Sequence, residues 1–357
     1  MSERVLMKGN EAMAEAAIRA GCHHFFGYPI TPQTEVAAYM SKKMPKLGGT
    51  YLQAESEVSA INMVLGAAAA GVRAMTSSSS PGISLKTEGI SYIAGCDLPC
   101  VIVNVMRGGP GLGGIQPSQA DYWQATRALG HGDFNVLVFA PSSVQELVNM
   151  VFMAFEKAEE YRMPSLILSD GLMGQMMEPV SFPDNPEVKT FEKPWAATGH
   201  GNKRPQNVIN SLYLQPDKLE KTVEERFERY EAVKAREQAA QEYLCEDAEI
   251  IVTAFGASAR IAQSAVNIVR AEGLKVGLLR PIMLWPFPEK YIKKHLTHAK
   301  AFLSVEMNMG QMVDDVRLAV SGAVPVDFYG RTGGMIPTPN AIAAKLRELA
   351  KSVGGAK

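Results

Sequence analysis

The sequence predicts an α/β protein built from two three-layer domains with mainly parallel sheets. Short apolar segments that are typical of strands alternate with polar turns and helical segments in both halves of the chain. Residues 98–106 are apolar nearly without alternation, as in a parallel strand buried on both faces. The length of 357 residues fits two domains. We therefore expect a doubly wound domain followed by a smaller three-layer domain.

In the first half, each predicted strand is followed by a polar turn and a helix. Strands are predicted over 24–28, 50–54, 73–76, 98–106, 136–140 and 165–169. A first helix is predicted over 8–20 with Asn10 as its cap, and a second one runs from the Glu55-Ser56-Glu57 turn to Gly71. Two prolines stiffen the corner over 29–35, and residues 77–82 form a polar loop.

The second half repeats this alternation after an irregular stretch. Strands are predicted over 248–255, 275–280 and 301–306, with a helix that ends near Gly273 and a loop over 281–288. We expect residues 1–180 to form the first domain, 181–247 a connection and 248–357 the second domain. Within the connection, residues 217–244 have apolar residues at helical spacing and predict one charged amphipathic helix. This helix is either a surface helix packed on its own chain or a docking arm for a partner.

Composition excludes several classes of function. The chain has 36 Lys and Arg against 37 Asp and Glu, a net charge of −1, so no bulk positive charge attracts nucleic acid or anionic lipid. The N-terminus lacks an export signal, and no apolar run approaches the ~20 residues that span a bilayer, which predicts a cytoplasmic protein. The four cysteines are too few and too dispersed for a disulfide framework, and we expect buried reduced thiols.

Candidate ligand-binding residues follow the strands of the first domain. In an open parallel sheet, ligands gather beyond the carboxyl ends of the strands. The turns there contribute Thr31, Glu55 or Glu57, the loop 77–82, and Arg107 with the glycines that follow it. No GxGxxG follows the first strand and no P-loop motif occurs, so neither a dinucleotide site nor a P-loop nucleotide site is supported.

These side chains also have purely structural explanations. A glutamate in the first turn of a helix interacts favourably with the helix dipole, which stabilises the helix by ~0.3–1 kcal/mol. Arg107 ends a buried strand, where an arginine must reach a polar site or an anion, and its planar fork suits bidentate capture of a carboxylate. A structural ion pair is the alternative for Arg107. In the second half, the turn 256–258 either binds an anion or is a tight strand-to-helix turn, and we assign it no catalytic residue.

Four motifs in the first domain lead to a resemblance. They are Gly27-Tyr28-Pro29-Ile30-Thr31-Pro32, Gln53-Ala54-Glu55-Ser56-Glu57, the segment from Thr76 to Gly82, and Val105-Met106-Arg107-Gly108-Gly109-Pro110. The similarity continues through residues 140–143, 279–286 and 330–331. With these motifs in order, the chain resembles the alpha-type subunit of 2-oxoacid:ferredoxin oxidoreductases over nearly its whole length.

The resemblance implies a thiamine diphosphate-binding fold of the pyrimidine type, followed by a transketolase C-terminal-like domain. It implies that thiamine diphosphate is shared with a beta-type partner subunit, which binds the diphosphate and its Mg²⁺. The sequence agrees, because Ser169-Asp170-Gly171 lacks the first glycine of the family's diphosphate motif, and we expect no metal ligand in this chain. No CxxCxxC run occurs, so 4Fe-4S clusters are expected on partner subunits.

Further partners are implied by the same resemblance. They are a gamma-type subunit, a ferredoxin-like cluster subunit and an external ferredoxin, in a complex expected to be a dimer of heteromers. The implied reaction is oxidative decarboxylation of a 2-oxoacid, with coenzyme A as the co-substrate that accepts the acyl group.

The resemblance also assigns roles to single residues. Glu57 corresponds to the carboxylate that hydrogen-bonds the cofactor's pyrimidine ring and promotes deprotonation of the thiazolium carbon, with Glu55 as the alternative. A charge-assisted bond of this kind contributes roughly 1.5–3 kcal/mol. Arg107 corresponds to the arginine that binds the substrate carboxylate, and Thr31 to the threonine near the carbonyl oxygen. Further contacts to the cofactor are expected from Tyr28, Pro29 and Ser79.

The segment after Arg107 bears on substrate preference. A 2-oxoglutarate enzyme needs a cation or several donors for the distal carboxylate, whereas a branched-chain substrate needs only an apolar pocket. Residues 111–119 offer no cation, and the motifs are more similar to the branched-chain type, which acts on 3-methyl-2-oxobutanoate. The alternatives are the 2-oxoglutarate type, a thiamine enzyme that works without ferredoxin, such as a lipoyl-dependent dehydrogenase or a transketolase, and a structural subunit that has lost its site.

Overall fold

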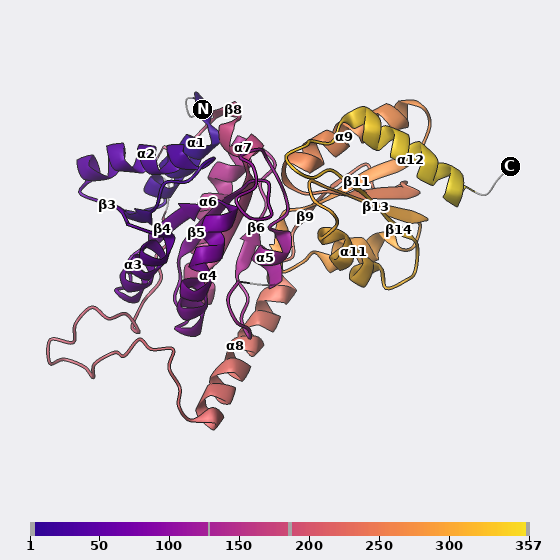
Figure 1. The fold of residues 1–357 in the computed structure, drawn as a ribbon. Helices are drawn as coiled ribbons and strands as arrows, with labels where there is room; N and C mark the ends of the chain where they lie inside the picture. Colours follow the sequence, from indigo (N-terminus) through magenta and orange to yellow (C-terminus); the bar gives the residue numbers. More distant parts are fainter. Residues whose placement is uncertain (1–3, 128, 185–187, 355–357) are drawn as a thin grey trace.

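The computed structural model describes residues 4–127, 129–184 and 188–354. Its N-terminal half contains a seven-stranded sheet with the order β12-β6-β7-β5-β4-β2-β3 (Figure 1). These strands are β2 (His24–Gly27), β3 (Thr50–Gln53), β4 (Ala74–Ser78), β5 (Val101–Met106), β6 (Leu137–Phe139), β7 (Ser165–Asp170) and β12 (Met283–Trp285). Neighbouring strands are parallel except for β12, which is antiparallel to β6. The predicted parallel sheet is confirmed, and its edge strand comes from the second half of the chain.

Helices cover both faces of this sheet. They are α1 (Gly9–Arg19), α2 (Thr34–Lys43), the 3-10 helix η1 (Met44–Leu47), α3 (Glu57–Ala69), α4 (Ser80–Gly95), α5 (Tyr122–Arg127), α6 (Val144–Tyr161) and α7 (Gly171–Gln175). Helices α3 and α4 pack on each other and over β2, β4 and β5, whereas α1 packs on α6, which lies against β6 and β7. Every residue of β4, β5 and β7 is buried, so both faces are covered. A short antiparallel pair, β1 (Val5–Lys8) with β8 (Met177–Val180), completes this half.

The C-terminal half has its own five-stranded sheet, in the order β14-β13-β10-β11-β9. Its strands are β9 (Ala240–Tyr243), β10 (Ile250–Thr253), β11 (Val276–Pro281), β13 (Ala301–Glu306) and β14 (Val326–Gly330), and its helices are α9 (Gly256–Ala271), α10 (Glu289–His295), α11 (Met312–Val320) and α12 (Pro339–Val353). Only β9 is antiparallel to its neighbour. A separate hydrophobic cluster lies between this sheet and the helices α9 and α12. The second three-layer domain is therefore confirmed.

Three local predictions were wrong. Asn10 does not cap α1, because it lies inside the helix, is fully buried and donates its amide to Pro32 O at 2.8 Å and to Glu35 at 2.9 Å. The expected loop over 281–288 contains strand β12. The expected loop over 77–82 is shorter, because β4 continues to Ser78 and α4 begins at Ser80.

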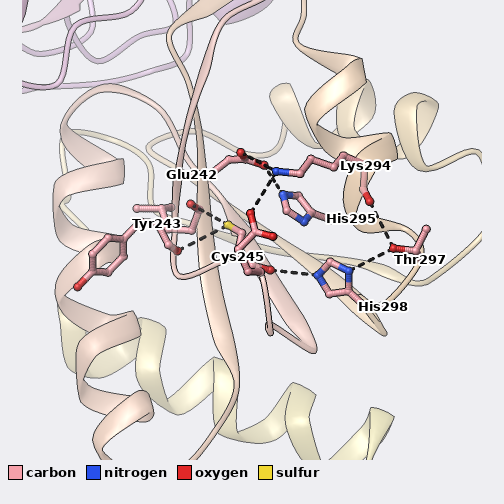
Figure 2. Close-up of polar contacts among 9 residues, drawn as sticks. Glu242, Tyr243, Cys245, Lys294, His295, Thr297 and His298 are labelled. Atoms are coloured by element: carbon pink, nitrogen blue, oxygen red, sulfur yellow. Dashed lines mark hydrogen bonds and ion pairs between the residues drawn. The ribbon is translucent and has the colours of Figure 1, made fainter.

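The amphipathic helix α8 (Pro216–Glu237) ends earlier than the predicted 217–244. Residues 240–243 form β9 instead, which is an edge strand of the second sheet. Glu242 of this strand forms a hydrogen bond with His295 of α10. Figure 2 shows the Glu242 carboxylate facing both His295 and Lys294, and the Lys294 Nζ lies 3.1 Å from Glu242 Oε2. Burial raises the pKa of Glu242, but the hydrogen bonds from Lys294 and His295 outweigh it and lower the pKa. This polar anchor favours a strand over a longer helix.

Helix α8 packs on its own chain through its C-terminal half. Tyr230 and Val233 are buried, and the Tyr230 ring lies edge-on to Trp285 with centroids 5.6 Å apart. The N-terminal end of α8 projects away from the sheet (Figure 1), and Leu219 there is exposed. Described residues between β8 and α8 form neither helix nor strand, as predicted, while residues 185–187 of the expected connection lie outside the described part.

The four cysteines are free thiols. Cys22, Cys100 and Cys245 are buried as predicted, whereas Cys96 is half-buried. Burial raises the pKa of the Cys22 and Cys100 thiols to about 12, so they carry no thiolate at neutral pH. Across the described residues, no helix combines the length and the apolar character needed to cross a membrane.

Candidate active site

Four neighbouring strands deliver the predicted ligand residues to one edge of the first sheet. Strands β3, β2, β4 and β5 are consecutive and parallel, so their carboxyl ends lie side by side. Thr31 follows β2, Glu57 follows β3, Ser79 follows β4 and Arg107 follows β5. This edge is where ligands bind in open parallel sheets.

Glu57 is the first residue of α3. The helix begins here because Ser56 caps it, accepting a hydrogen bond from the Ser59 backbone N–H at 3.2 Å. Glu57 is only 5% exposed, and within the described part of the chain no group donates a hydrogen bond to its carboxylate. A buried carboxylate needs a partner, so the helix dipole alone does not account for this one. Glu55, by contrast, is exposed and bonds the Ser59 hydroxyl.

Gly82 of α4 makes room for this carboxylate. A methyl group at Gly82 would lie 2.7 Å from Glu57 Oε1 and would overlap Ser78 Oγ. The Glu57 carboxylate therefore lies directly against the α4 backbone, beside the Ser78 hydroxyl. Among the described residues, the buried hydroxyls of Ser78, Ser79 and Thr76 have no hydrogen-bond partner either. The Glu57 carboxylate and the neighbouring Ser78 hydroxyl thus both lack a hydrogen-bond partner among the described residues, which is the pattern of a site that binds a polar ligand.

Substitution of Gly82 by alanine should displace the carboxylate. Because the new methyl group would overlap Glu57 and Ser78, we expect Gly82→Ala to destabilise the chain by about 1–3 kcal/mol in urea unfolding. The matched control is Gly66→Ala in α3, where no atom lies within 4 Å, and alanine should be neutral or stabilising by up to ~1 kcal/mol. Equal effects of the two substitutions would contradict the packing described for Gly82.

Arg107 is buried and braces two loops. Its Nη1 donates to Thr31 O at 2.9 Å and its Nη2 to Leu112 O at 3.2 Å, while its Nε has no partner among the described residues. Arg107 makes no ion pair with any described acidic residue, so the structural ion pair considered above is not what holds it. Carbonyl oxygens do not neutralise the positive charge of a buried guanidinium, so this group can still bind an anion.

The backbone of Arg107 is held by a polar network that the sequence did not reveal. Ser80 Oγ accepts from the Arg107 N–H at 3.0 Å and donates to Asp121 at 2.6 Å. Asn104 accepts from the Ser80 N–H at 3.1 Å and donates to Asp121 at 2.8 Å. Burial raises the pKa of Asp121, and the bonds from Ser80 and Asn104 only partly oppose this shift. The network ties the start of α4 to the end of β5.

The proline corner is anchored through Gln33. Its side chain accepts from Ser77 Oγ at 2.5 Å and donates to Tyr28 O at 3.2 Å, which fixes the corner against β4. Tyr28 is half-buried, whereas Pro29 and Thr31 are exposed. The Thr31 side chain makes no hydrogen bond with the described residues, so only its carbonyl joins it to Arg107.

A pocket of about 370 Å³ lies between α4 and the glycine-rich loop. It is lined by Ser80, Pro81, Ser84, Asp121 and residues 108–111. The glycines expose backbone on one wall, and the Ser80–Asp121 pair provides the polar groups on the other. This pocket adjoins Arg107 through Gly108.

The turn 256–258 and Asp170 bind each other. The Asp170 carboxylate accepts the backbone N–H groups of Leu172 and Met173 at 3.0 Å and also that of Ala257. Burial raises the pKa of Asp170, and these bonds oppose the shift. Ser258 donates to Gln119 at 2.7 Å. The turn is thus filled by its own chain, which favours the tight-turn explanation, and Asp170 is occupied in joining the two domains.

Two family models match the chain. Residues 15–242 match "Pyruvate flavodoxin/ferredoxin oxidoreductase, thiamine diP-bdg", and residues 248–342 match "Pyruvate:ferredoxin oxidoreductase core domain II". Fold and matches define a thiamine diphosphate-binding α/β protein. The chain belongs to the 2-oxoacid:ferredoxin oxidoreductase family, in which its relatives are subunits of multi-subunit oxidoreductases. The resemblance seen in the sequence motifs is confirmed.

Similar proteins include a ketoisovalerate oxidoreductase subunit, VorB, from Methanothermobacter marburgensis, which is 48% identical over 97% of this chain and 97% of its own length. The 2-oxoglutarate synthase subunit KorA of the same organism is 36% identical over 97% of this chain and 99% of its own. Among solved structures, 2-oxoglutarate:ferredoxin oxidoreductase from Magnetococcus marinus, with 2-oxoglutarate, coenzyme A and succinyl-CoA bound, matches with a TM-score of 0.86 and 27% identity. The match covers 97% of this chain but 65% of that one.

A split-gene transketolase, an inactive beta4 tetramer, shares the fold. Its TM-score is 0.60 at 13% identity, over 97% of this chain and 99% of its own. This likeness supports the expected fold, a thiamine diphosphate-binding domain followed by a transketolase C-terminal-like domain.

Proposed function

We propose that this chain is the pyrimidine-side subunit of a thiamine diphosphate-dependent 2-oxoacid:ferredoxin oxidoreductase. The reaction converts one 2-oxoacid and one coenzyme A into one acyl-CoA and one CO2. The two electrons released pass singly to two ferredoxin molecules. The single observation that carries the proposal is the Glu57 carboxylate at the ligand-binding edge of the sheet, which is buried and accepts no hydrogen bond from the described residues.

The donor set suits an aminopyrimidine. Such a ring carries both hydrogen-bond donors and acceptors. At this edge of the sheet, the Glu57 carboxylate and the hydroxyls of Ser78 and Ser79 make no hydrogen bond with the described residues. When bound, thiamine diphosphate supplies a carbon nucleophile and an electron sink for decarboxylation. Glu57 would hold the proton shared with the ring nitrogen. Tyr28 and Pro29 would line the cofactor from the proline corner.

Arg107 and Thr31 would orient the substrate. The positive charge of Arg107, which no described acidic residue neutralises, suits the substrate carboxylate. The Thr31 hydroxyl makes no hydrogen bond with the described residues and would donate toward the carbonyl oxygen. Because Arg107 also bonds the Thr31 carbonyl, a shift of either residue would move the other. The two contacts therefore act as one positioning unit.

The remaining cofactors are assigned to partners. A beta-type subunit would bind the diphosphate and Mg²⁺, because Asp170, the nearest match to the diphosphate motif, already bonds three backbone N–H groups of this chain. A gamma-type subunit and a ferredoxin-like subunit that carries 4Fe-4S clusters would complete a dimer of heteromers that reduces an external ferredoxin. We place this complex in the cytoplasm.

We infer a branched-chain substrate, 3-methyl-2-oxobutanoate. The loop after Arg107 carries exposed Leu112 and Ile115 and no cation over residues 111–119, which suits an apolar side chain better than a second carboxylate. The higher identity to the ketoisovalerate subunit, 48% against 36% for the 2-oxoglutarate subunit, supports the same choice.

Parallel substrate assays test this proposal. The chain is purified anaerobically with its native partners, and coenzyme A-dependent reduction of a viologen dye is followed with 3-methyl-2-oxobutanoate, 2-oxoglutarate and pyruvate. We expect kcat/KM to be at least about 10-fold higher for the branched acid, since each buried methylene contributes ~1–3 kcal/mol of discrimination. A preference for 2-oxoglutarate would overturn the proposed substrate but would still support the proposed reaction class. No reduction with any of the three, by a complex that holds cofactor and clusters, would overturn the function.

A further inference from the structure

One face of α4 packs tightly on the start of α3. Gly82 lies against the Glu57 carboxylate, and about two turns further along the helix a methyl group at Gly89 would overlap Ile61 Cγ2. Lys86 lies between them, four residues after Gly82 and three before Gly89. Residues at these spacings share one face of a helix, so the Lys86 side chain enters the interface between two close-packed helices.

Lys86 is completely buried there. Its ammonium makes one hydrogen bond within the described chain, to the Glu57 carbonyl oxygen at 3.5 Å, and no ion pair with a described acidic residue at contact distance. Desolvation lowers the pKa of Lys86 to about 8, and the negative charge of Glu57 acts against this shift. An ammonium that can donate three hydrogen bonds is thus buried with one long hydrogen bond to the described chain, and its acceptor is the backbone of Glu57.

We propose that Lys86 is a positioning residue for Glu57. Its hydrogen bond to the Glu57 carbonyl oxygen fixes the first turn of α3, and its positive charge attracts the Glu57 carboxylate. This inference rests on the role proposed for Glu57.

An apolar side chain would fill the same space at lower cost. Methionine is an unbranched apolar side chain one atom shorter than lysine, and it requires no desolvation of a charge. A site selected only for helix packing therefore gains nothing from lysine. The position of Lys86 one turn from Gly82, whose missing side chain admits the carboxylate, instead couples both residues to Glu57.

A double-mutant cycle on the full chain without cofactor tests the coupling. Lys86→Met, Glu57→Gln and the double variant are compared with wild type by urea unfolding. Lys86→Met changes the unfolding equilibrium constant by one factor in the wild-type background and by another in the Glu57→Gln background. We expect these two factors to differ by at least about 10-fold. Lys86→Arg should preserve most of the coupling. The matched control Lys42→Met, at an exposed lysine of α2, should give the same factor in both backgrounds. Additivity within about 2-fold for Lys86→Met would overturn the proposal.

Cofactor affinity provides a second readout if a variant unfolds too readily. Thiamine diphosphate is titrated into the complex with its native partners, and we expect Lys86→Met to weaken binding about 5–10-fold with Glu57 present and less than 2-fold in the Glu57→Gln background. Equal weakening in both backgrounds would overturn the role of Lys86. If Glu57→Gln leaves cofactor affinity and turnover unchanged, the proposed role of Glu57 fails, whatever the cycle shows. If Glu57→Gln abolishes turnover but the cycle is additive, only the inference about Lys86 fails.

Discussion

Replacement of Glu57 by glutamine should lower the kcat of the assembled complex by about 10²–10⁴-fold, the usual contribution of a positioned acid–base group. Glutamine keeps the size of the side chain but cannot share a proton with the pyrimidine ring. The loss should appear with every 2-oxoacid substrate, because the proposed role of the carboxylate is to act on the cofactor and not on the substrate. Anaerobic viologen reduction measures it, and co-purification shows that assembly is intact.

Glu55→Gln is the matched control for this substitution. It makes the same chemical change two residues earlier, at an exposed side chain that bonds Ser59 and no other side chain among the described residues. We expect less than a 3-fold change in kcat. If the Glu55 variant lost activity and the Glu57 variant kept it, the role proposed for Glu57 would belong to Glu55. Full activity of both variants would favour the alternative that this chain is a structural subunit that has lost its site.

Substitution of Arg107 by methionine should lower kcat/KM by about 10²–10³-fold. Charge-assisted hydrogen bonds contribute roughly 1.5–3 kcal/mol each, and a bidentate contact to the substrate carboxylate involves two of them. The bonds to the Thr31 and Leu112 carbonyls disappear as well, so both KM and kcat should change. Steady-state kinetics with 3-methyl-2-oxobutanoate measure the effect.

Arg107→Lys separates charge from geometry. Lysine keeps the charge but lacks the planar fork, so this variant should retain part of the activity, with a raised KM. Arg127→Met is a control at an arginine whose partner is Asp315 and whose side chain is 41% exposed, and it should leave kcat/KM within 2-fold. Unchanged kcat/KM in the Arg107→Met variant would exclude Arg107 from substrate binding.

Much of the first domain could be predicted from the sequence because its strands are short, apolar and buried on both faces. The residues after the strands, such as Thr31 and Arg107, could be found because parallel strands end at one edge of the sheet. Strands β9 and β12 could not, since each is stabilised by pairing with a strand distant in the sequence. Asn10 was mistaken for a cap because a buried asparagine bonded to a distant loop has the same local pattern.

The supporting residues of the site were missed for a related reason. Asp121 lies seventeen residues after Asn104, and nothing in the local pattern indicates that the two meet at Ser80. Lys86 had a weak signal, a lysine with glycines four residues before and three after it in a largely apolar helix. Only the structure shows that this face meets Glu57.

We propose that Glu57 of this chain activates the cofactor held between this chain and a partner. Hydrogen–deuterium exchange at the reactive thiazolium carbon of bound thiamine diphosphate, measured by NMR after rapid quenching of the intact complex, tests it most directly. We expect exchange to be at least about 100-fold slower with Glu57→Gln than with wild type or Glu55→Gln. Exchange at the wild-type rate in a Glu57→Gln complex that retains its cofactor would contradict the claim.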